Sequence, residues 1–223
     1  MITFVIAVKD SPEIDSATLE MQILSCLRVE NARVLVGLSD NAHCHMEAWR
    51  SHLIFSNPRV SLTVTQDKGL YEGWNKLVEQ TQTPLVSFLG IGDVVLQPKF
   101  FSSVSIYPSK HNAVFSRVVI IGQNRSRFFG RTFQLWRHKI KQEVAFIGAV
   151  FDRSLIAEMP FDESYKIVGD YEWLMRCAPR LNSTFIPTVS VAMDAGGMSE
   201  SLVIAMRLET VRAKSIWNSD MFT

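Results

Sequence analysis

The stretch LYEGWNKLVEQTQTPLVSFLGIGDV, residues 70–94, joins a helical pattern to a buried strand and then to a single acid. Its first apolar residues recur at the three- and four-residue spacing of one helix face: Leu70, Trp74, Leu77 and Val78. The apolar run at residues 85–89 then predicts a strand that is covered on both faces. Asp93 comes four residues after this run, between a glycine and a valine.

The same alternation of strand and helix patterns extends back to the N-terminus. Apolar runs at residues 2–8 and 33–39, and the segment RVSLTVT at residues 59–65, predict three further strands. Two helical stripes separate them: Leu19, Ile23 and Leu27 in the first, and Met46, Trp49 and Leu53 in the second. This order predicts an α/β fold with a mostly parallel, doubly wound, Rossmann-like sheet and helices on both faces. In such sheets ligands bind outside the carboxyl ends of the strands.

The composition excludes several classes of protein. The chain has 223 residues, of which 47% are hydrophobic, and a net charge of +1, so one globular α/β domain is expected without an overall bias toward nucleic acid. Its three cysteines have the spacing of neither a disulfide framework nor a zinc site. No apolar run reaches 18 residues, and the first one lacks a basic segment before it. A cytoplasmic protein, at most peripheral to a membrane, is therefore expected.

Three acids follow three successive predicted strands. Asp40, Asp67 and Asp93 are each expected at the carboxyl edge of the sheet, where carboxylates that hold Mg²⁺ or Mn²⁺ can in turn bind a diphosphate. Each acid is equally compatible with a turn or a helix cap, since Asp is favoured at both. The residues alone leave both interpretations open.

Three ordered blocks of the sequence resemble the family-2 nucleotide-sugar glycosyltransferases, which have a GT-A type fold. The blocks are QDKGLYEGWNKLVEQTQTPLVSFLGIGDVV at residues 66–95, FDESYKIVGDYEWLMR at residues 161–176, and AGGMS at residues 195–199. The resemblance implies one glycosyltransferase domain over residues 1–223. Residues 1–96 would form the half that binds the nucleotide-sugar and residues 97–200 the acceptor side, with a C-terminal helix at residues 201–223.

The resemblance also implies a role for individual residues. Asp40 falls where the family contacts the nucleotide base, and Asp67 and Lys68 fall in the block that lines the nucleotide pocket. Asp93 takes the last place of the metal-binding acids, where it would hold Mg²⁺ or Mn²⁺ against the donor diphosphate. Asp170 falls where the inverting members keep the base that takes a proton from the acceptor hydroxyl.

The implied activity is an inverting, metal-assisted transfer in the biosynthesis of bacterial polysaccharide or glycolipid. The donor would be a UDP-, GDP- or dTDP-sugar, and the acceptor a saccharide or a lipid-linked molecule. A nucleotidyltransferase on a similar sheet would need a basic phosphate loop after the first strand. Residues 8–15 contain one lysine and no glycine, and therefore disfavour that activity.

The residues around Asp170 support an acid at a helix start. Gly169 and Asp170 precede a helical stripe of Tyr171, Leu174 and Ala178, so the helix dipole and the free N–H groups should favour the ionised carboxylate. An ionised carboxylate can accept a proton. A simple helix cap gives the same pattern, and the local sequence does not separate the two.

Two departures from the family pattern support an alternative. Gly92 stands where the family usually has another acid before the last metal ligand, and Phe146 stands near a position where relatives often carry histidine. The alternative is therefore a non-catalytic relative that acts as a nucleotide-sugar-binding or assembly module.

The segment at residues 94–142 contains no acid. It contains nine cations: Lys99, Lys110, Arg117, Arg125, Arg127, Arg131, Arg137, Lys139 and Lys141. The segment is compatible with a solvated basic surface, with a cradle for the donor pyrophosphate, or with a docking face for a lipid phosphate at the inner face of an anionic membrane. Interleaved aromatic residues also suit single-stranded nucleic acid, but no other part of the chain supports such a partner.

Two further patterns favour structural roles. His43, Cys44 and His45 lie too close together to point at one metal ion from a helix, so a helix-start cluster is expected there. In the last helix, Ile204, Leu208 and Val211 form a stripe that is expected to pack against the domain.

Overall fold

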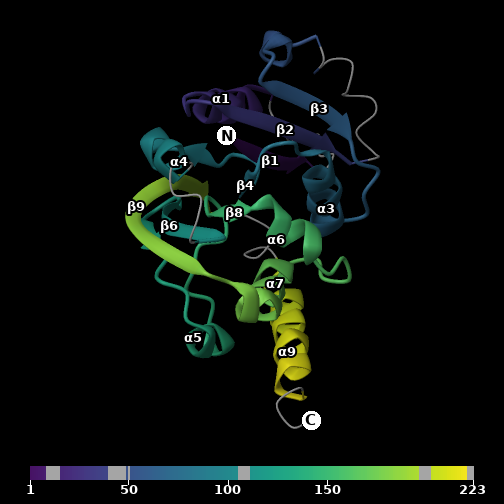
Figure 1. The fold of residues 1–223 in the computed structure, drawn as a ribbon, viewed down its shortest axis with the longest axis vertical. Coiled ribbons are helices and arrows are strands. Elements are labelled where there is room, and N and C mark those ends of the chain that lie inside the picture. Colours follow the sequence, from purple (N-terminus) through teal and green to yellow (C-terminus); the bar gives the residue numbers. More distant parts are fainter. Residues whose placement is uncertain (9–15, 40–48, 50, 105–110, 196–201, 220–223) are drawn as a thin grey trace.

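A nine-stranded sheet connects the two halves of the chain in the computed structural model, which describes residues 1–8, 16–39, 49, 51–104, 111–195 and 202–219 (Figure 1). The strand order is β3-β2-β1-β4-β8-β6-β9-β5, with β7 paired to β6 outside this path. The first four strands are parallel to one another: β1 Ile2–Val8, β2 Ala32–Leu38, β3 Val60–Val64 and β4 Leu85–Leu89.

Antiparallel pairs attach the second half of the sheet to the first. Its strands are β5 Val94–Val95, β6 Ala113–Ile121, β7 Ser126–Phe129, β8 Val150–Asp152 and β9 Ser183–Asp194. Strand β8 is antiparallel to both β4 and β6, and so bridges the halves, whereas β6 and β9 are parallel. The short β5 pairs with the end of β9, which brings the segment after β4 next to the last strand of the sheet.

Helices cover both faces of the sheet. They are α1 Ser16–Leu27, α3 Leu70–Gln80, α4 Pro98–Val104, α5 Leu135–Ile140, α6 Arg153–Glu158, α7 Gly169–Cys177 and α9 Val203–Ser219, with 3-10 turns η2 Leu53–Ser56 and η3 Ala178–Arg180. Alternate residues of β1 enter separate cores: Phe4 packs with α1 and α4, whereas Val5 packs with α3, α6 and α7. The α/β prediction with helices on both faces is confirmed.

The helical stripes of the sequence are confirmed in two cases and wrong in part in two others. Helices α1 and α3 form where they were expected, with Ile23 and Trp74 buried. The predicted helix at residues 46–53 falls mostly outside the described residues, and Leu53 begins a 3-10 turn with 85% of its surface exposed. Because a 3-10 turn has three residues per turn, its side chains do not continue an α-helical stripe.

The expectation for the last helix is also wrong. Ile204, Leu208 and Val211 are 78%, 68% and 66% exposed, so their stripe points away from the domain. The opposite side of α9 packs inward through Ala213 and Trp217. A helix with apolar residues on two sides can bury either of them, and its own sequence does not decide which.

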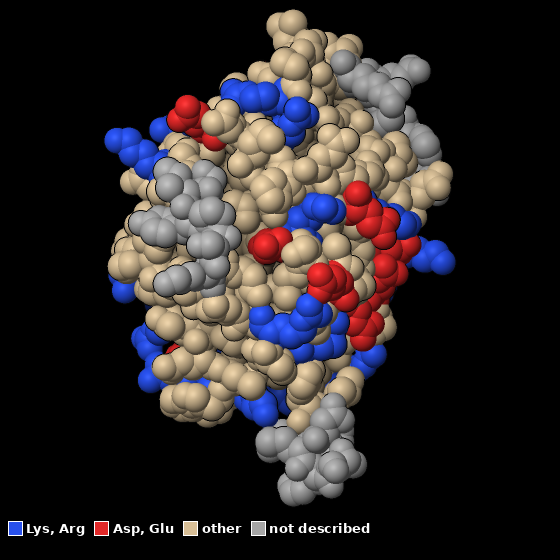
Figure 2. Space-filling model, viewed as in Figure 1, with Lys and Arg blue, Asp and Glu red and all other residues tan. Residues whose placement is uncertain are grey.

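Charges of both signs are distributed over the surface. Figure 2 shows basic side chains over much of one face and most of its acidic side chains gathered at the middle and right, in keeping with the net charge of +1. No helix among the described residues is long and apolar enough to cross a bilayer.

Candidate active site

The carboxyl ends of β1 to β4 lie at one edge of the sheet because the four strands are parallel. Residues 65–68 follow β3 at this edge, and residues 90–93 follow β4. Asp40, which follows β2, lies outside the described residues, as do His43, Cys44 and His45. The edge therefore presents Asp67, Lys68 and Asp93 among the residues singled out from the sequence.

Asp67 lies against the start of α3. Its carboxylate accepts a hydrogen bond from the hydroxyl of Thr65. A Cβ atom at Gly73 would come within 3.2 Å of the Asp67 carboxyl, so the glycine allows the acid to lie close to the helix. The backbone N–H of Lys68 donates to Glu72 Oε2 at 2.8 Å, which fixes the loop to the first turn of α3. The loop after β3 is thus held by the helix that follows it.

Asp93 closes a tight turn after β4 and is 4% exposed. Its Oδ2 accepts from the N–H of Gly90 at 2.6 Å, and the backbone N–H of Asp93 donates to Gly90 O at 3.2 Å. Gln22 of α1 fixes the same turn, because its Nε2 donates to Gly90 O at 2.6 Å. Gly92 has a φ of +84°, which favours glycine over an acid at that position. Position 92, where the resemblance implies an acid, therefore has a left-handed backbone conformation that favours the glycine present here.

The electrostatics of Asp93 suit a bound cation. Burial raises the pKa of its carboxyl to about 7, and the nearby carboxylate of Asp194 adds to this effect, while the Gly90 N–H opposes it. Among the described residues, no group of three His, Cys, Asp or Glu side chains could hold a metal ion. A hard oxygen ligand of this kind fits Mg²⁺ or Mn²⁺ that is bound through one or two carboxylates together with substrate phosphates.

Asp67 and Asp93 do not form one cluster. Strands β2 and β1 lie between β3 and β4, so the two ends are separated by three strand spacings, or about 14 Å. They can therefore contact only different parts of one extended ligand along the sheet edge.

Asp170 is brought to this edge by contacts from two distant segments. Tyr71, in the first turn of α3, donates from Oη to Asp170 Oδ1 at 3.3 Å and to Ile167 O at 2.7 Å. Gln142, which follows α5, donates from Nε2 to Asp170 Oδ2 at 3.1 Å. Both carboxylate oxygens thus have a side-chain donor. Neither donor was assigned a role from the sequence, since the two contacts span 99 and 28 residues.

The environment of Asp170 differs in part from the sequence-based expectation. Asp170 lies in the first turn of α7, but the N-cap residue is Val168, so the acid is not the cap. Burial raises the pKa of the Asp170 carboxyl, although the donors Gln142 and Tyr71 act in the opposite direction. Backbone N–H groups at the start of α7 also favour the ionised form, as the sequence predicts, but burial has the larger effect on this pKa. A carboxylate with a raised pKa is a stronger base.

Comparisons with known proteins place this geometry in a fold family. No family model matches the chain. A PGL/p-HBAD biosynthesis glycosyltransferase of Mycobacterium bovis (strain BCG / Pasteur 1173P2) is 23% identical over 144 residues, covering 61% of this chain and 56% of that protein. A protein of the same name from Mycobacterium tuberculosis (strain ATCC 25177 / H37Ra) matches equally. The chain therefore spans little more than half the length of these relatives.

Solved structures match the fold over almost the whole chain. Residues 1–349 of TarS from S. aureus superimpose with a TM-score of 0.60 at 13% identity, covering 93% of this chain and 63% of that one. The mannosyltransferase PcManGT from Pyrobaculum calidifontis gives a TM-score of 0.57 at 12% identity, over 86% of this chain and 56% of that one. The chain has the fold of the GT-A type glycosyltransferases.

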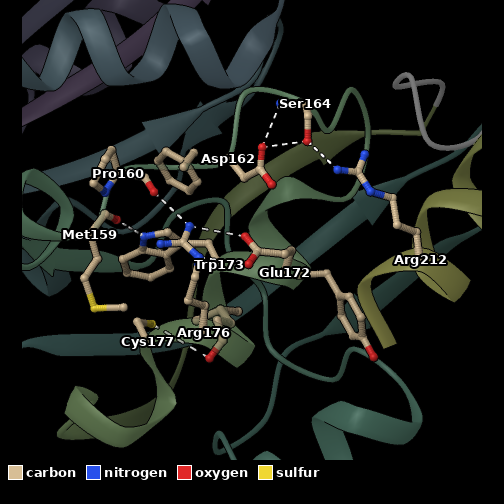
Figure 3. Close-up of polar contacts among 12 residues, drawn as sticks. Met159, Pro160, Asp162, Ser164, Glu172, Trp173, Arg176, Cys177 and Arg212 are labelled. Carbon is tan, nitrogen blue, oxygen red and sulfur yellow. Dashed lines mark hydrogen bonds and ion pairs between the residues drawn. The ribbon is translucent and has the colours of Figure 1, made fainter. Parts of the chain in front are cut away.

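Within this GT-A fold, the segment that precedes Asp170 is held on two sides. Trp173 of α7 donates from Nε1 to the carbonyl of Met159, and Arg176 donates to the carbonyl of Pro160 at 2.8 Å (Figure 3). From the other side, Arg212 of α9 donates to Ser164 Oγ at 2.7 Å. The loop between α6 and α7 is therefore held by hydrogen bonds from α7 and from α9.

Glu209 of α9 extends this support to the residues just before Asp170. Its Oε1 accepts from the N–H of Lys166 at 2.8 Å, and its Oε2 accepts from the N–H groups of Ile167 and Val168 at 2.9 and 3.0 Å. One carboxylate thus satisfies three successive backbone donors. The position of Asp170 in the GT-A fold consequently depends on α9 as well as on α7.

Phe146 has a packing role in this GT-A fold. It is 2% exposed and stacks on Phe151 with 4.8 Å between the ring centroids. Trp74 and Trp173 complete the aromatic cluster around it. Position 146 is therefore part of the core.

His138 is a buried imidazole that the sequence did not single out. Its Nε2 pairs with the carbonyl of Tyr171 at 3.1 Å, and its ring lies 4.5 Å from the Tyr171 ring. Burial lowers the pKa of this histidine to about 4, so the imidazole is neutral near pH 7. Its neighbour in the first turn of α7 is Tyr171, the residue that follows Asp170 in the chain.

Proposed function

We propose that the chain is an inverting, family-2-like glycosyltransferase. It moves a sugar from a nucleoside-diphosphate sugar to a hydroxyl of a saccharide or lipid-linked acceptor in polysaccharide or glycolipid biosynthesis. The observation that carries the proposal is the contact between Asp170 and Tyr71, because it joins a candidate base to the helix that begins at the carboxyl edge of the sheet.

The names of similar proteins support this activity. The mycobacterial relatives are glycosyltransferases, TarS 1–349 has been solved in complex with UDP and with UDP-GlcNAc, and PcManGT in complex with GDP-Man and Mn²⁺. A UDP- or GDP-sugar is accordingly the first donor class to test, followed by a dTDP-sugar.

The residues of this chain have separate roles along the sheet edge. Asp67 and Lys68, together with Asp40, contact the nucleotide. Asp93 lies about three strand spacings away, where it faces the diphosphate and holds Mg²⁺ or Mn²⁺. When bound, the divalent ion supplies positive charge that stabilises the departing nucleoside diphosphate.

Asp170 acts on the acceptor. Its carboxylate takes the proton of the acceptor hydroxyl, and the oxygen forms a bond to the anomeric carbon. The bond from that carbon to the diphosphate oxygen breaks, and the nucleoside diphosphate leaves with the electron pair. Because Tyr71 and Gln142 each hold one oxygen of Asp170, the carboxylate is fixed in orientation before the acceptor binds.

A non-catalytic nucleotide-sugar-binding module remains the second candidate. It is favoured by the left-handed backbone of Gly92, which leaves Asp93 as the acid of the turn after β4. Such a module would bind a donor with the same residues but would not need a base at position 170.

The experiment compares the purified chain with Asp170→Asn, using UDP-, GDP- and dTDP-sugars with Mn²⁺. Asparagine keeps an oxygen and the size of the side chain, so the fold should be retained, while a lost general base reduces kcat by about 10² to 10⁴. Donor binding, measured by calorimetry, should not change. The matched control Asp152→Asn changes a cap of α6 and should retain activity.

The results separate the two candidates. If the parent chain binds a donor and turns it over, and Asp170→Asn abolishes the turnover, the enzyme is supported. If the parent chain and Asp170→Asn bind the donor equally and neither turns it over, the binding module is supported. If no sugar nucleotide binds with Mn²⁺, both are wrong.

A further inference from the structure

The outward side of α9 presents an apolar stripe where a packed helix normally presents polar residues. Ile204, Leu208 and Val211 follow one another at i, i+4 and i+7, and each is at least 66% exposed. The inward side of the same helix carries Ala213 and Trp217, which pack on the domain. This stripe is a second apolar face, in addition to the one that holds α9 in place.

Cations flank the stripe on both sides. On the helical projection, Arg207 and Lys214 lie along one flank and Arg212 along the other. The acid of this helix, Glu209, points inward to the backbone N–H groups of residues 166–168. The outward half of α9 is thus apolar at its centre and positive at its margins, the pattern of a helix that lies in a membrane interface.

Helix α5 adds a second element of the same chemistry at the same end of the molecule (Figure 1). Trp136 and Ile140 are 61% and 69% exposed, and the Arg137 guanidinium lies 5.0 Å from the Trp136 ring centroid. The ammonium of Lys214 donates to Ile140 O at 2.8 Å, so α5 and α9 are in direct contact. Tryptophan and cations are the side chains that favour the boundary between lipid tails and headgroups.

The surface charge fits a negative partner. In Figure 2 the lower end of the visible face, where α5 and α9 lie, is mostly tan and blue. Neither helix has an acid on its outward side, and α5 has none at all. A second copy of the chain is a poor partner for the stripe, because a symmetric contact would bring Arg207 and Arg212 of both copies together.

We propose that the outward faces of α9 and α5 dock on the surface of an anionic lipid bilayer. The apolar stripe inserts at the level of the headgroups, and Arg207 on its flank binds a lipid phosphate. Arg212 and Lys214 keep their contacts with Ser164 and Ile140 O and add positive charge near the surface. The docking helix is the one whose Glu209 holds the residues just before Asp170. The functional role of this docking rests on the proposed transfer to a lipid-linked acceptor, since docking would bring the candidate base Asp170 close to the lipid headgroups.

The test measures sedimentation of the full chain with vesicles of phosphatidylcholine alone and with vesicles in which about a third of the lipid is phosphatidylglycerol, which gives a negative surface potential. Binding should require the anionic lipid and weaken with salt. The triple variant Ile204→Ser/Leu208→Ser/Val211→Ser should bind at least about tenfold more weakly. Arg207→Ala should bind about fivefold more weakly, since each cation near such a surface contributes about 1 kcal/mol.

A matched control removes exposed apolar residues at the other end of the molecule. Met21, Leu24 and Leu53 are 58%, 50% and 85% exposed, and their replacement by serine should leave vesicle binding unchanged. Because all four stripe and flank changes are at exposed positions, circular dichroism and thermal unfolding should match those of the parent chain.

Three results would each overturn the proposal. In the first, the parent chain sediments with anionic vesicles no more than it does without vesicles. In the second, the triple variant binds the anionic vesicles as well as the parent, and in the third the parent forms a concentration-dependent dimer in lipid-free solution that the triple variant does not form. Vesicle binding requires neither donor nor turnover, so failure of the glycosyl transfer would leave a positive result intact.

Discussion

Tyr71 Oη lies 3.3 Å from Asp170 Oδ1, although the two residues are 99 positions apart in the chain. The first belongs to α3, the helix after β3, and the second to α7, which begins at Gly169. The same hydroxyl also donates to the carbonyl of Ile167, so it joins the N-terminal half of the chain to the backbone that precedes the candidate base. Four predictions concern this contact, the turn that holds Asp93, and the Glu209 clamp, by which we mean the Glu209 carboxylate and the three backbone N–H groups of residues 166–168 that it accepts from.

Tyr71→Phe should move the acidic limb of the pH–rate profile to higher pH. The hydroxyl opposes the rise in the pKa of Asp170, so its loss raises that pKa further, and the base becomes active only at higher pH. Unfolding in urea should show a loss of about 1 kcal/mol. Tyr165→Phe is the control, because Tyr165 Oη is buried without a hydrogen-bond partner among the described residues. An unchanged limb in Tyr71→Phe would show that the hydroxyl does not act on the base.

Gly92→Asp should strengthen Mn²⁺ binding and weaken the fold. A Cβ at Gly92 would meet only Thr18 Cγ2, at 3.9 Å, so space is available, but the φ of +84° costs about 1 kcal/mol for a side chain. Calorimetry with Mn²⁺ and donor measures the gain. Gly92→Asn is a control that carries the backbone strain without the charge. Equal Mn²⁺ affinity in Gly92→Asp and Gly92→Asn would show that a carboxylate at position 92 does not bind the metal ion.

Asp93 should make the free energy of unfolding fall as pH rises from about 4 to 7 in the presence of a chelator. Its carboxyl has a pKa of about 7 in the folded state, against an ordinary value of 3.8 for aspartate, so the folded state binds more protons across this window. The loss should be of the order of a few kcal/mol.

Asp93→Asn should flatten this dependence, since an amide does not titrate. Urea unfolding at several pH values measures both chains, and Asp152→Asn should behave like the parent. A parent chain that gains stability over the same window would contradict the burial argument.

Glu209→Gln should destabilise the protein by about 1–3 kcal/mol and lower kcat. Three backbone N–H groups lose a charged acceptor, and an amide oxygen can replace only part of it. Thermal unfolding and turnover measure the effect. Glu158→Gln is the control, because its pair with Arg180 is more than half exposed and surface pairs contribute about 0–1 kcal/mol. Equal losses in both variants would mean that the clamp has no special role.

The sequence determined the layers of this fold. Periodicity identified the strands and most helices of the first 90 residues, because an apolar run or stripe reports which faces of an element must be buried. The alternation then fixed the parallel sheet and the edge where its acids lie. The resemblance added roles for Asp67, Lys68, Asp93 and Asp170, which remain predictions.

Only the tertiary structure decided what surrounds those acids. The donors to Asp170, the turn that buries Asp93 and the clamp of Glu209 all join residues far apart in the chain or depend on backbone angles. The orientation of α9 was likewise open, because both of its sides are apolar and packing against α7 selected one. Local patterns record which side chains avoid water, whereas the partners of a buried polar group are fixed by how whole elements pack.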